Sequence, residues 1–307
     1  MSPPSLRIGT RGSPLALAQA RETRRRLAAA HGCDEDRFPL VIIKTSGDMI
    51  QDRALSESGG KGLFTKEIDV AMLAGEIDIA VHSSKDLPTL LPDGIIVAGF
   101  LPREDVRDAL ISAKARSIRD LPQGGTFGTA SLRRQAQVKR LRPDLQVGLL
   151  RGNVETRLIK AERGEIDATL LAYAGLKRLG LAHRATALLE IDEFLPAVGQ
   201  GAIGVTARPD DEATRTALAK ILHPATGLAL ACERAFLAVL DGSCRTPIAG
   251  HARIVGNEVR FRGMVLRTDG SETFEVEAHG AANEAAALGE SAGRELLGRL
   301  PKGVLGA

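Results

Sequence analysis

The fold of this chain is decided by a short stretch that occurs twice, as GEIDIAV at residues 75–81 and as GEIDATLL at residues 164–171. A glycine at the end of a helical pattern stops the helix, and the helix expected over residues 65–73 stops in this way. The apolar run that follows each glycine is typical of a buried strand. The repeat therefore predicts two lobes built on one plan.

The segment at the start of each lobe repeats as well. Residues 6–10 read as a strand, after which Ser13 marks the start of a long helix. In the second lobe, residues 126–129 end a strand and Ser131 precedes a helix over residues 132–141. Serine is a preferred N-cap. Both copies thus place a helix N-terminus and a strand end at one rim, where open α/β sheets bind ligands.

The rest of the chain predicts a return to the first lobe and a third unit. Residues 196–205 are glycine-rich and apolar, which suits a crossing from the second lobe back to the first. From His223 onward, a long helix, three strands and a final helix form a separate pattern. We expect an α/β fold of two lobes plus a smaller α+β C-terminal domain. The expected bounds are 1–101 with 201–220 for lobe 1, 105–197 for lobe 2 and 223–307 for the C-terminal domain.

Composition excludes several classes of protein. The 41 basic and 38 acidic residues leave a net charge of +3, too little to indicate a nucleic-acid partner. Eight Phe, one Tyr and no Trp also disfavour a platform for base stacking. No run of 18 apolar residues and no apolar leader are present, so we expect a cytoplasmic protein with no membrane contact. Three widely spaced cysteines fit neither a disulfide framework nor a metal site.

One of these cysteines, Cys244, lies in a turn rather than in a core. Asp-Gly-Ser before it and Thr-Pro after it are turn residues, and they follow a helix-like apolar run over residues 226–240. The neighbouring Arg245 favours the thiolate, which is the form of cysteine that makes covalent bonds. Most loop cysteines do no chemistry, so an ordinary loop cysteine remains the alternative interpretation at this point.

Four arginines gather at the predicted helix starts of the second lobe. Arg133 and Arg134 fall in the first turn of one helix, while Arg151 and Arg157 bracket the capping pair 152–153 of another. A cation at the positive end of a helix costs about 0.3–1 kcal/mol. Bound carboxylates or phosphates would explain why the arrangement occurs at two helices. The sequence therefore predicts an anion site.

Single basic and acidic residues at the rim of the first lobe fit the same interpretation. Arg11 sits just before a helix start, and Lys85 and Asp86 follow a strand end. A solvated arginine and a loop ion pair are the alternatives at these positions.

Taken in order, the motifs resemble the porphobilinogen deaminase (hydroxymethylbilane synthase) family over nearly the whole chain. Several long motifs in sequence are far more specific than any one of them. They are LRIGTRGSPLALAQA (6–20), GGKGLF (59–64), DIAVHSSKDLP (78–88), GTASLRRQAQ (128–137), LRGNVETRL (150–158), AGLKRLGL (174–181), LPAVGQGA (195–202) and GSCRTPI (242–248).

The resemblance implies a fold and a reaction. The two lobes would be similar to type II periplasmic binding proteins, with the smaller domain carrying the cysteine. Cys244 would hold a dipyrromethane cofactor through a thioether. The enzyme would be a transferase of porphyrin and haem biosynthesis that joins four porphobilinogen molecules head to tail, with loss of ammonia, to give hydroxymethylbilane. We expect a monomer that passes its product to uroporphyrinogen-III synthase.

The resemblance also assigns residues. Asp86 would be the catalytic carboxylate, stabilising the cation formed when ammonia leaves. No metal is implied. The acidic Glu57 stands where some members carry a lysine, which puts in doubt a contact from that loop. The cofactor-binding residues would be Lys85, Thr129, Ser131, Arg133, Arg134 and Arg157. The substrate-binding residues would be Arg11, Ser13, Lys61, Arg151, Arg178 and Gln200.

Two other classes of protein remain as alternatives. A solute-binding or effector-sensing protein would share the two-lobed plan, but it would need neither an accessible cysteine nor a third domain. A cysteine-nucleophile acyl transferase would explain Cys244, yet no histidine partner is evident because His82 and His251 are equally uncommitted.

We predict that Cys244→Ser abolishes stable cofactor attachment, whereas Cys33→Ser and Cys232→Ser do not. Only Cys244 lies in a turn beside an arginine, where a thiolate is both favoured and accessible. Peptide mass mapping of the purified proteins is the measurement. A dipyrrole found on Cys33 or Cys232 would contradict the prediction.

Overall fold

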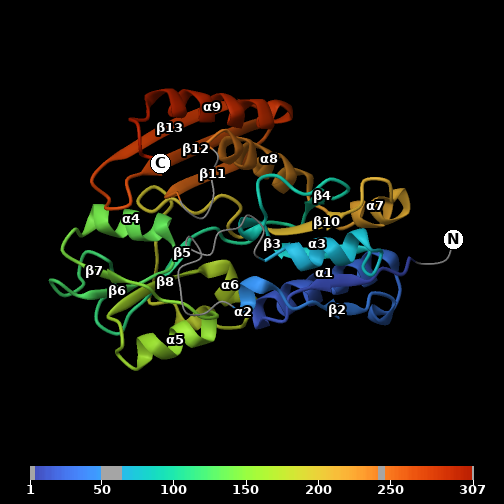
Figure 1. The fold of residues 1–307 in the computed structure, drawn as a ribbon, viewed down its shortest axis with the longest axis horizontal. Helices are drawn as coiled ribbons and strands as arrows, with labels where there is room; N and C mark the ends of the chain where they lie inside the picture. The colour runs from blue at the N-terminus through green and yellow to red at the C-terminus, as the bar shows by residue number, and fades with distance from the viewer. Residues whose placement is uncertain (1–3, 50–63, 241–245, 306–307) are drawn as a thin grey trace. The chain divides into compact units, whose positions relative to one another are not determined.

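The computed structural model describes residues 4–49, 64–240 and 246–305. The chain forms two compact units, and each is described here by itself. Unit 1 contains residues up to 49 together with 64–104 and 202–227. Unit 2 contains residues 105–201 and those from 228 onward. Figure 1 labels the helices and strands.

Unit 1 is built on a five-stranded sheet with helices on both faces. The strands run in the order β2-β1-β3-β10-β4, where β1, β2 and β3 are parallel and β10 is antiparallel to both of its neighbours. The strands are β1 (Ile8–Thr10), β2 (Leu40–Ile42), β3 (Ile79–Ser83), β4 (Ile96–Phe100) and β10 (Ile203–Ala207). The helices and 3-10 turns are α1 (Pro14–His31), η1 (Glu35–Arg37), α2 (Ser46–Met49), α3 (Lys66–Leu73), η3 (Ser84–Asp86) and α7 (Glu212–Ala219).

Successive side chains of β3 point to opposite faces of the sheet, and this explains why unit 1 has two hydrophobic cores. Ile79 and Val81 pack with α1 and α7 on one face, and Ala80 packs with α3 on the other. A strand buried on both faces reads as a continuous apolar run, which is how the sequence presents it. The predicted start of α1 is confirmed, because the Ser13 side chain accepts a hydrogen bond from the backbone N–H of Ala16 at 3.3 Å.

Unit 2 contains a second five-stranded sheet with the same arrangement. Its order is β7-β6-β8-β5-β9, with β6, β7 and β8 parallel and β5 antiparallel to its two neighbours. Two lobes built on one plan are therefore confirmed. The strands are β5 (Asp108–Ile111), β6 (Thr126–Gly128), β7 (Gln146–Gly148), β8 (Ala168–Ala172) and β9 (Ala187–Leu188). The helices are α4 (Leu132–Leu141), α5 (Val154–Glu162), α6 (Tyr173–Arg178) and η4 (Ala182–Arg184).

The repeated GEID stretch makes the same backbone turn in both lobes. Gly75 follows α3 and Gly164 follows α5, each with φ of 70°. This left-handed conformation is one that glycine adopts without steric cost, so it ends the helix and turns the chain toward the next strand.

The aspartate of each GEID stretch forms hydrogen bonds that join the following strand to its neighbour. The Asp78 carboxylate accepts the backbone N–H of Arg7 at 2.7 Å, and the Asp78 N–H donates to the Arg7 carbonyl at 3.0 Å. In the second lobe, the Asp167 carboxylate accepts the backbone N–H of Thr126 at 2.7 Å, and the Asp167 N–H donates to the Thr126 carbonyl at 2.9 Å. Each aspartate therefore fixes the register at which β3 or β8 enters its sheet.

The C-terminal part of unit 2 is a three-stranded antiparallel sheet covered by helices (Figure 1). It confirms the predicted smaller α+β domain and hence the fold class. Its first helix is close to the helix-like run over 226–240, and its last is the predicted final helix. The elements are α8 (Pro224–Val239), β11 (Ile248–Val255), β12 (Glu258–Leu266), β13 (Thr273–Ala281), η5 (Ala282–Glu284) and α9 (Ala285–Arg299).

This sheet also shares a small core with the preceding lobe. Ala136 of α4 and Leu195 pack against Ala249, Met264 and Leu266 of β11 and β12. Residues 105–201 consequently form one unit with the C-terminal elements. The three-domain division remains a prediction.

Some short strands have no clear pattern in the sequence. Between residues 88 and 126 the structure places β4 and β5. Both are short, and β4 pairs with β10, which comes more than 100 residues later in the chain. Strands of this kind depend on partners that local sequence patterns do not contain. No helix in the described ranges is long and apolar enough to cross a membrane.

We predict opposite effects for two glycines of α9. A Cβ on Gly289 would lie 2.0 Å from the backbone oxygen of Cys232 in α8, so Gly289→Ala should lower the free energy of unfolding by about 3 kcal/mol. A Cβ on the exposed Gly298 would meet no atom within 4 Å, so Gly298→Ala should raise it by about 0.5–1 kcal/mol. Urea unfolding is the measurement, and equal effects of the two variants would contradict this packing.

Candidate active site

The predicted catalytic residue Asp86 lies directly after β3, in the short turn η3. Its Oδ2 is 4.0 Å from Nη1 of Arg11, and the two side chains are 36% and 20% exposed. The Arg11 guanidinium also stacks on the ring of Phe64, 4.1 Å from the ring centroid. The structure therefore pairs Asp86 with Arg11, whose head is oriented by an aromatic face. Lys85 beside them is exposed.

A small cavity of about 50 Å³ opens at this place in unit 1. It brings together Asp86, Arg11 and the helix-capping Ser13, as the sequence analysis predicts. It also includes His82, which the sequence analysis left unassigned. The residues that line it are Arg11, Ser13, Leu15, Ala16, Gln19, Phe64, Thr65, Val81, His82, Ser83 and Asp86.

His82 is neutral in this site. Burial lowers the pKa of its imidazole from 6.5 to about 4, and the positive charge of Arg11 acts in the same direction. Its Nε2 lies 3.2 Å from the hydroxyl of Thr206 on β10. A buried, neutral imidazole beside Arg11 keeps further positive charge out of the cavity.

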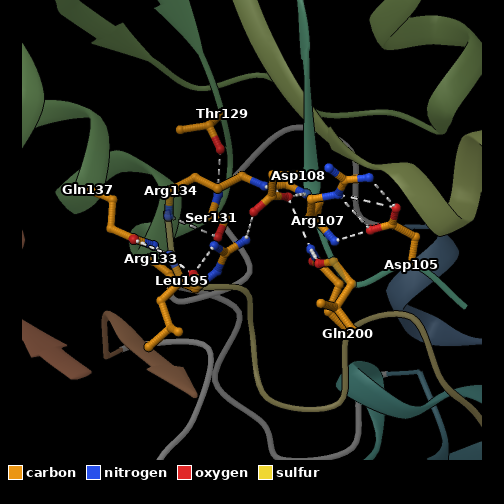
Figure 2. Close-up of polar contacts among 11 residues, drawn as sticks. Asp105, Arg107, Asp108, Thr129, Ser131, Arg133, Arg134, Gln137, Leu195 and Gln200 are labelled. Atoms are coloured by element: carbon orange, nitrogen blue, oxygen red, sulfur yellow. Dashed lines mark hydrogen bonds and ion pairs between the residues drawn. The ribbon is translucent and has the colours of Figure 1, made fainter. Parts of the chain in front are cut away.

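Unit 2 contains a separate cluster of buried charges around Asp108 (Figure 2). The Asp108 carboxylate is fully buried. Its Oδ2 accepts a bond of 2.8 Å from Nη2 of Arg133. Its Oδ1 accepts bonds of 3.1 and 2.7 Å from Nε and Nη2 of Arg134, and one of 3.2 Å from Nε2 of Gln200. Three predicted ligand-binding residues therefore converge on one aspartate, which the sequence analysis missed.

Local structure explains why the arginines point there. The Ser131 hydroxyl accepts from the N–H of Arg134 at 3.4 Å and so caps α4, which places both arginines in its first turn. Thr129 precedes this turn, and its hydroxyl accepts from the N–H of Ser131 at 3.1 Å. Nη1 of Arg133 donates to the carbonyl of Leu195 at 2.8 Å. The cap, the loop and the strand residue Asp108 thus hold both guanidinium groups in one orientation.

The charges of this cluster do not balance. Burial alone would raise the pKa of Asp108, but the charges of Arg133 and Arg134 outweigh burial and lower it to about 2. Burial and the charge of Arg134 lower the pKa of Arg133, while Asp108 opposes them. Arginine stays charged at neutral pH. Within the described ranges, two guanidinium groups therefore face one carboxylate, and Nε of the buried Arg133 has no hydrogen-bond partner.

A second buried carboxylate, Glu233 of α8, holds the segment that carries Gln200. Its Oε2 accepts the N–H of Gly199 at 2.8 Å, and its Oε1 accepts the N–H of Ala252 at 2.7 Å. Gln200 itself donates to the carbonyl of Val106 at 2.7 Å as well as to Asp108. The sequence offered no signal for Glu233, because its partners are backbone groups distant along the chain.

The structure describes three of the remaining predicted residues, Arg178, Arg157 and Arg151. Nη2 of Arg178 donates to the carbonyl of Gly201 at 3.0 Å, next to Gln200. Nε of Arg157 donates to the carbonyl of Gly152 at 2.9 Å, in the capping turn of α5. Arg151 is half-buried and precedes that turn. Lys61 and Cys244 lie outside the residues that the structure describes.

Fold and site together define an α/β protein of two similar lobes and a smaller C-terminal domain, with a buried cluster of excess positive charge. A family model for "Porphobilinogen deaminase, dipyromethane cofactor binding domain" matches residues 6–216, and one for "Porphobilinogen deaminase, C-terminal domain" matches residues 228–298. The chain belongs to the porphobilinogen deaminase family, which confirms the resemblance.

Known proteins similar to this chain include two curated relatives and two solved structures. Porphobilinogen deaminases of Nitrobacter hamburgensis and Nitrobacter winogradskyi are each 61% identical over 292 residues, which cover 95% of this chain and 92% of the relative. A methionine-binding protein is 13% identical with a TM-score of 0.45, over 72% of this chain and 91% of its own. A periplasmic substrate-binding protein of an ABC transporter from Coxiella burnetii is 16% identical with a TM-score of 0.43, over 75% and 96%.

We predict that His82 makes the chain less stable as pH falls from 6.5 toward 4. Its folded pKa of about 4 lies below the unfolded value of 6.5, so only the unfolded chain takes up this proton in that range. The difference corresponds to about 3 kcal/mol. Urea unfolding of His82→Gln at pH 7 and pH 4.5 should show a smaller loss than the unsubstituted chain. His279→Gln, an exposed position, is the control. Equal losses in all three proteins would contradict the prediction.

Proposed function

We propose that this protein is the enzyme that joins four porphobilinogen molecules head to tail, with loss of ammonia at each addition, and releases hydroxymethylbilane. It is then a transferase of tetrapyrrole biosynthesis. Family matches over residues 6–216 and 228–298 support this activity. The observation that carries it is the buried Asp108 cluster, whose excess positive charge suits a ligand with several carboxylates.

The cluster fits the dipyrromethane cofactor that the first family domain binds. Each pyrrole ring carries an acetate and a propionate, and arginine binds carboxylates through paired hydrogen bonds. The unpartnered Nε of Arg133 is a buried donor that such an acceptor would satisfy. The cofactor supplies a covalently held primer for chain growth. We propose Cys244 as its point of attachment, and Lys85, Thr129, Ser131, Arg133, Arg134 and Arg157 as the residues that hold it.

Incoming porphobilinogen requires further anion-binding groups. Arg178 contacts the carbonyl next to Gln200, so both side chains are fixed by one turn of the chain. The Arg11–Asp86 pair is partly exposed and 4.0 Å long, so it is weak, and Arg11 can exchange Asp86 for a substrate carboxylate. We propose that Arg11, Ser13, Lys61, Arg151, Arg178 and Gln200 bind the substrate.

Asp86 is proposed to stabilise the cation that forms when ammonia leaves the substrate. The bond from the substrate methylene carbon to nitrogen breaks, ammonia leaves with the electron pair, and positive charge develops on the pyrrole. A carboxylate fixed beside that pyrrole stabilises the charge without reorganisation. The methylene carbon then bonds to the free α-carbon of the preceding ring, which loses a proton. In the free chain, Oδ2 of the Asp86 carboxylate lies 4.0 Å from Nη1 of Arg11, whose guanidinium stacks on Phe64.

Four finer points remain predictions. They are the division into domains at 1–101 with 201–220, 105–197 and 223–307, a monomeric state, a cytoplasmic location, and passage of the product to uroporphyrinogen-III synthase.

We predict that Asp86→Asn leaves a folded chain whose turnover falls by about 10²–10³. Asparagine keeps the size of the side chain but lacks the negative charge that faces the developing cation. Single-turnover kinetics of ammonia release, on chains whose mass shows two added pyrrole units, is the measurement. Asp93→Asn, an exposed position seven residues later, is the control.

Two results would contradict the proposal. Near-normal ammonia release by Asp86→Asn would remove Asp86 from the mechanism. An unsubstituted chain that carries no added pyrrole mass and forms no hydroxymethylbilane from porphobilinogen would overturn the proposed function itself.

A further inference from the structure

We propose that Asp108 is a positioning residue of this reaction, which fixes the guanidinium groups of Arg133 and Arg134 in the orientation that binds pyrrole carboxylates. The inference rests on the proposed function and deepens it. Asp108 does not touch the ligand, because its side chain is completely buried and its two oxygens already accept bonds from protein groups. It acts through the two arginines.

The contacts divide the carboxylate between the two arginines. Oδ2 accepts a hydrogen bond from Nη2 of Arg133, whereas Oδ1 accepts hydrogen bonds from both Nε and Nη2 of Arg134. Gln200 adds a donor to Oδ1, so the carboxylate cannot rotate without losing a bond. Because a guanidinium group is planar and rigid, fixing one edge of Arg134 also fixes the direction of its opposite edge. Figure 2 shows both side chains converging on Asp108.

Charge explains why the arrangement favours a ligand. Adjacent arginines repel one another, and Asp108 is the buried anion that lets both stay within one turn of α4. Among the residues that the structure describes, Asp108 neutralises only one of the two arginines, so this part of the cluster keeps one positive charge in a poorly solvated place. Nε of Arg133 is buried and finds no acceptor among the residues with described positions. Both features are those of an incomplete hydrogen-bond network that a further carboxylate completes.

The chain offers a matched control three residues earlier. Asp105 also pairs with an arginine, since its Oδ2 lies 2.8 Å from Nη2 of Arg107. That pair is partly exposed, with side chains 22% and 28% accessible. Asp105→Asn therefore removes an aspartate–arginine pair from the same segment and leaves Arg133 and Arg134 untouched.

The test compares Asp108→Asn, Asp108→Glu and Asp105→Asn with the unsubstituted chain. Intact mass gives the fraction of protein that carries two pyrrole units, before and after incubation with porphobilinogen. Steady-state kinetics gives KM and kcat of the loaded protein, and urea unfolding gives its stability. We expect Asp108→Asn to lower the loaded fraction or raise KM by about tenfold. Asp108→Glu should recover part of the loss, and Asp105→Asn should match the unsubstituted chain.

A second pair of variants keeps the proposal testable if Asp108→Asn does not fold. Arg133→Met removes one buried charge, so Asp108→Asn can be added without leaving two cations unpaired. If Asp108 orients Arg134, the double variant should load about tenfold less cofactor than Arg133→Met alone. Equal loading of these two proteins would show that Asp108 only balances charge, and would overturn the proposal.

The outcomes separate this inference from the proposed function. Normal loading and normal KM in Asp108→Asn, with an active unsubstituted chain, would overturn the inference alone. An unsubstituted chain that never gains pyrrole mass would overturn both. A loss of stability without any change in loading or KM would assign Asp108 a structural role and reject positioning.

Discussion

The buried bonds between Asp108 and two neighbouring arginines are the interaction on which the arrangement of unit 2 depends. They join the first residue of β5 to the first turn of α4, and Gln200 adds the segment that precedes β10. Removing one partner of a buried ion pair typically costs about 3–5 kcal/mol, because the other charge stays buried. Strand, helix and loop are therefore held together by the same groups that give this region its excess positive charge. The same three side chains therefore contribute both to the stability of unit 2 and to its excess positive charge.

One aspartate in each lobe has a structural role. Asp78 and Asp167 each accept the backbone N–H of one residue at the neighbouring strand and donate their own N–H to the carbonyl of that same residue. Each follows a glycine with φ of 70°, so a four-residue stretch both ends a helix and sets the register of the next strand. The two sheets therefore share the same contact at the entry of β3 beside β1 and of β8 beside β6.

Local chemistry decided what could be predicted from the sequence. The helix over 132–141 was predicted at its observed bounds because Ser131 supplies a cap, and the family motifs gave the candidate site residues. Asp108 could not be recognised, because its partners Arg133 and Arg134 come 25 and 26 residues later and only the folded sheet brings them together. The strands β4 and β5 were missed for the same reason, since their pairing partners are distant in sequence. The stacking of Arg11 on Phe64 likewise depends on tertiary structure.

The place of β10 in its sheet has a consequence for the order of synthesis. This strand is completely buried between β3 and β4, yet it follows the whole of the second lobe in the chain. Ile203 and Val205 also belong to the main core of unit 1. A ribosome that has released the first 100 residues has therefore produced a sheet with its fourth strand missing and the edges of β3 and β4 unpaired. The second five-stranded sheet, by contrast, is continuous in sequence from β5 to β9. All its strands can therefore pair before β10, the last strand of the first sheet, has been synthesised.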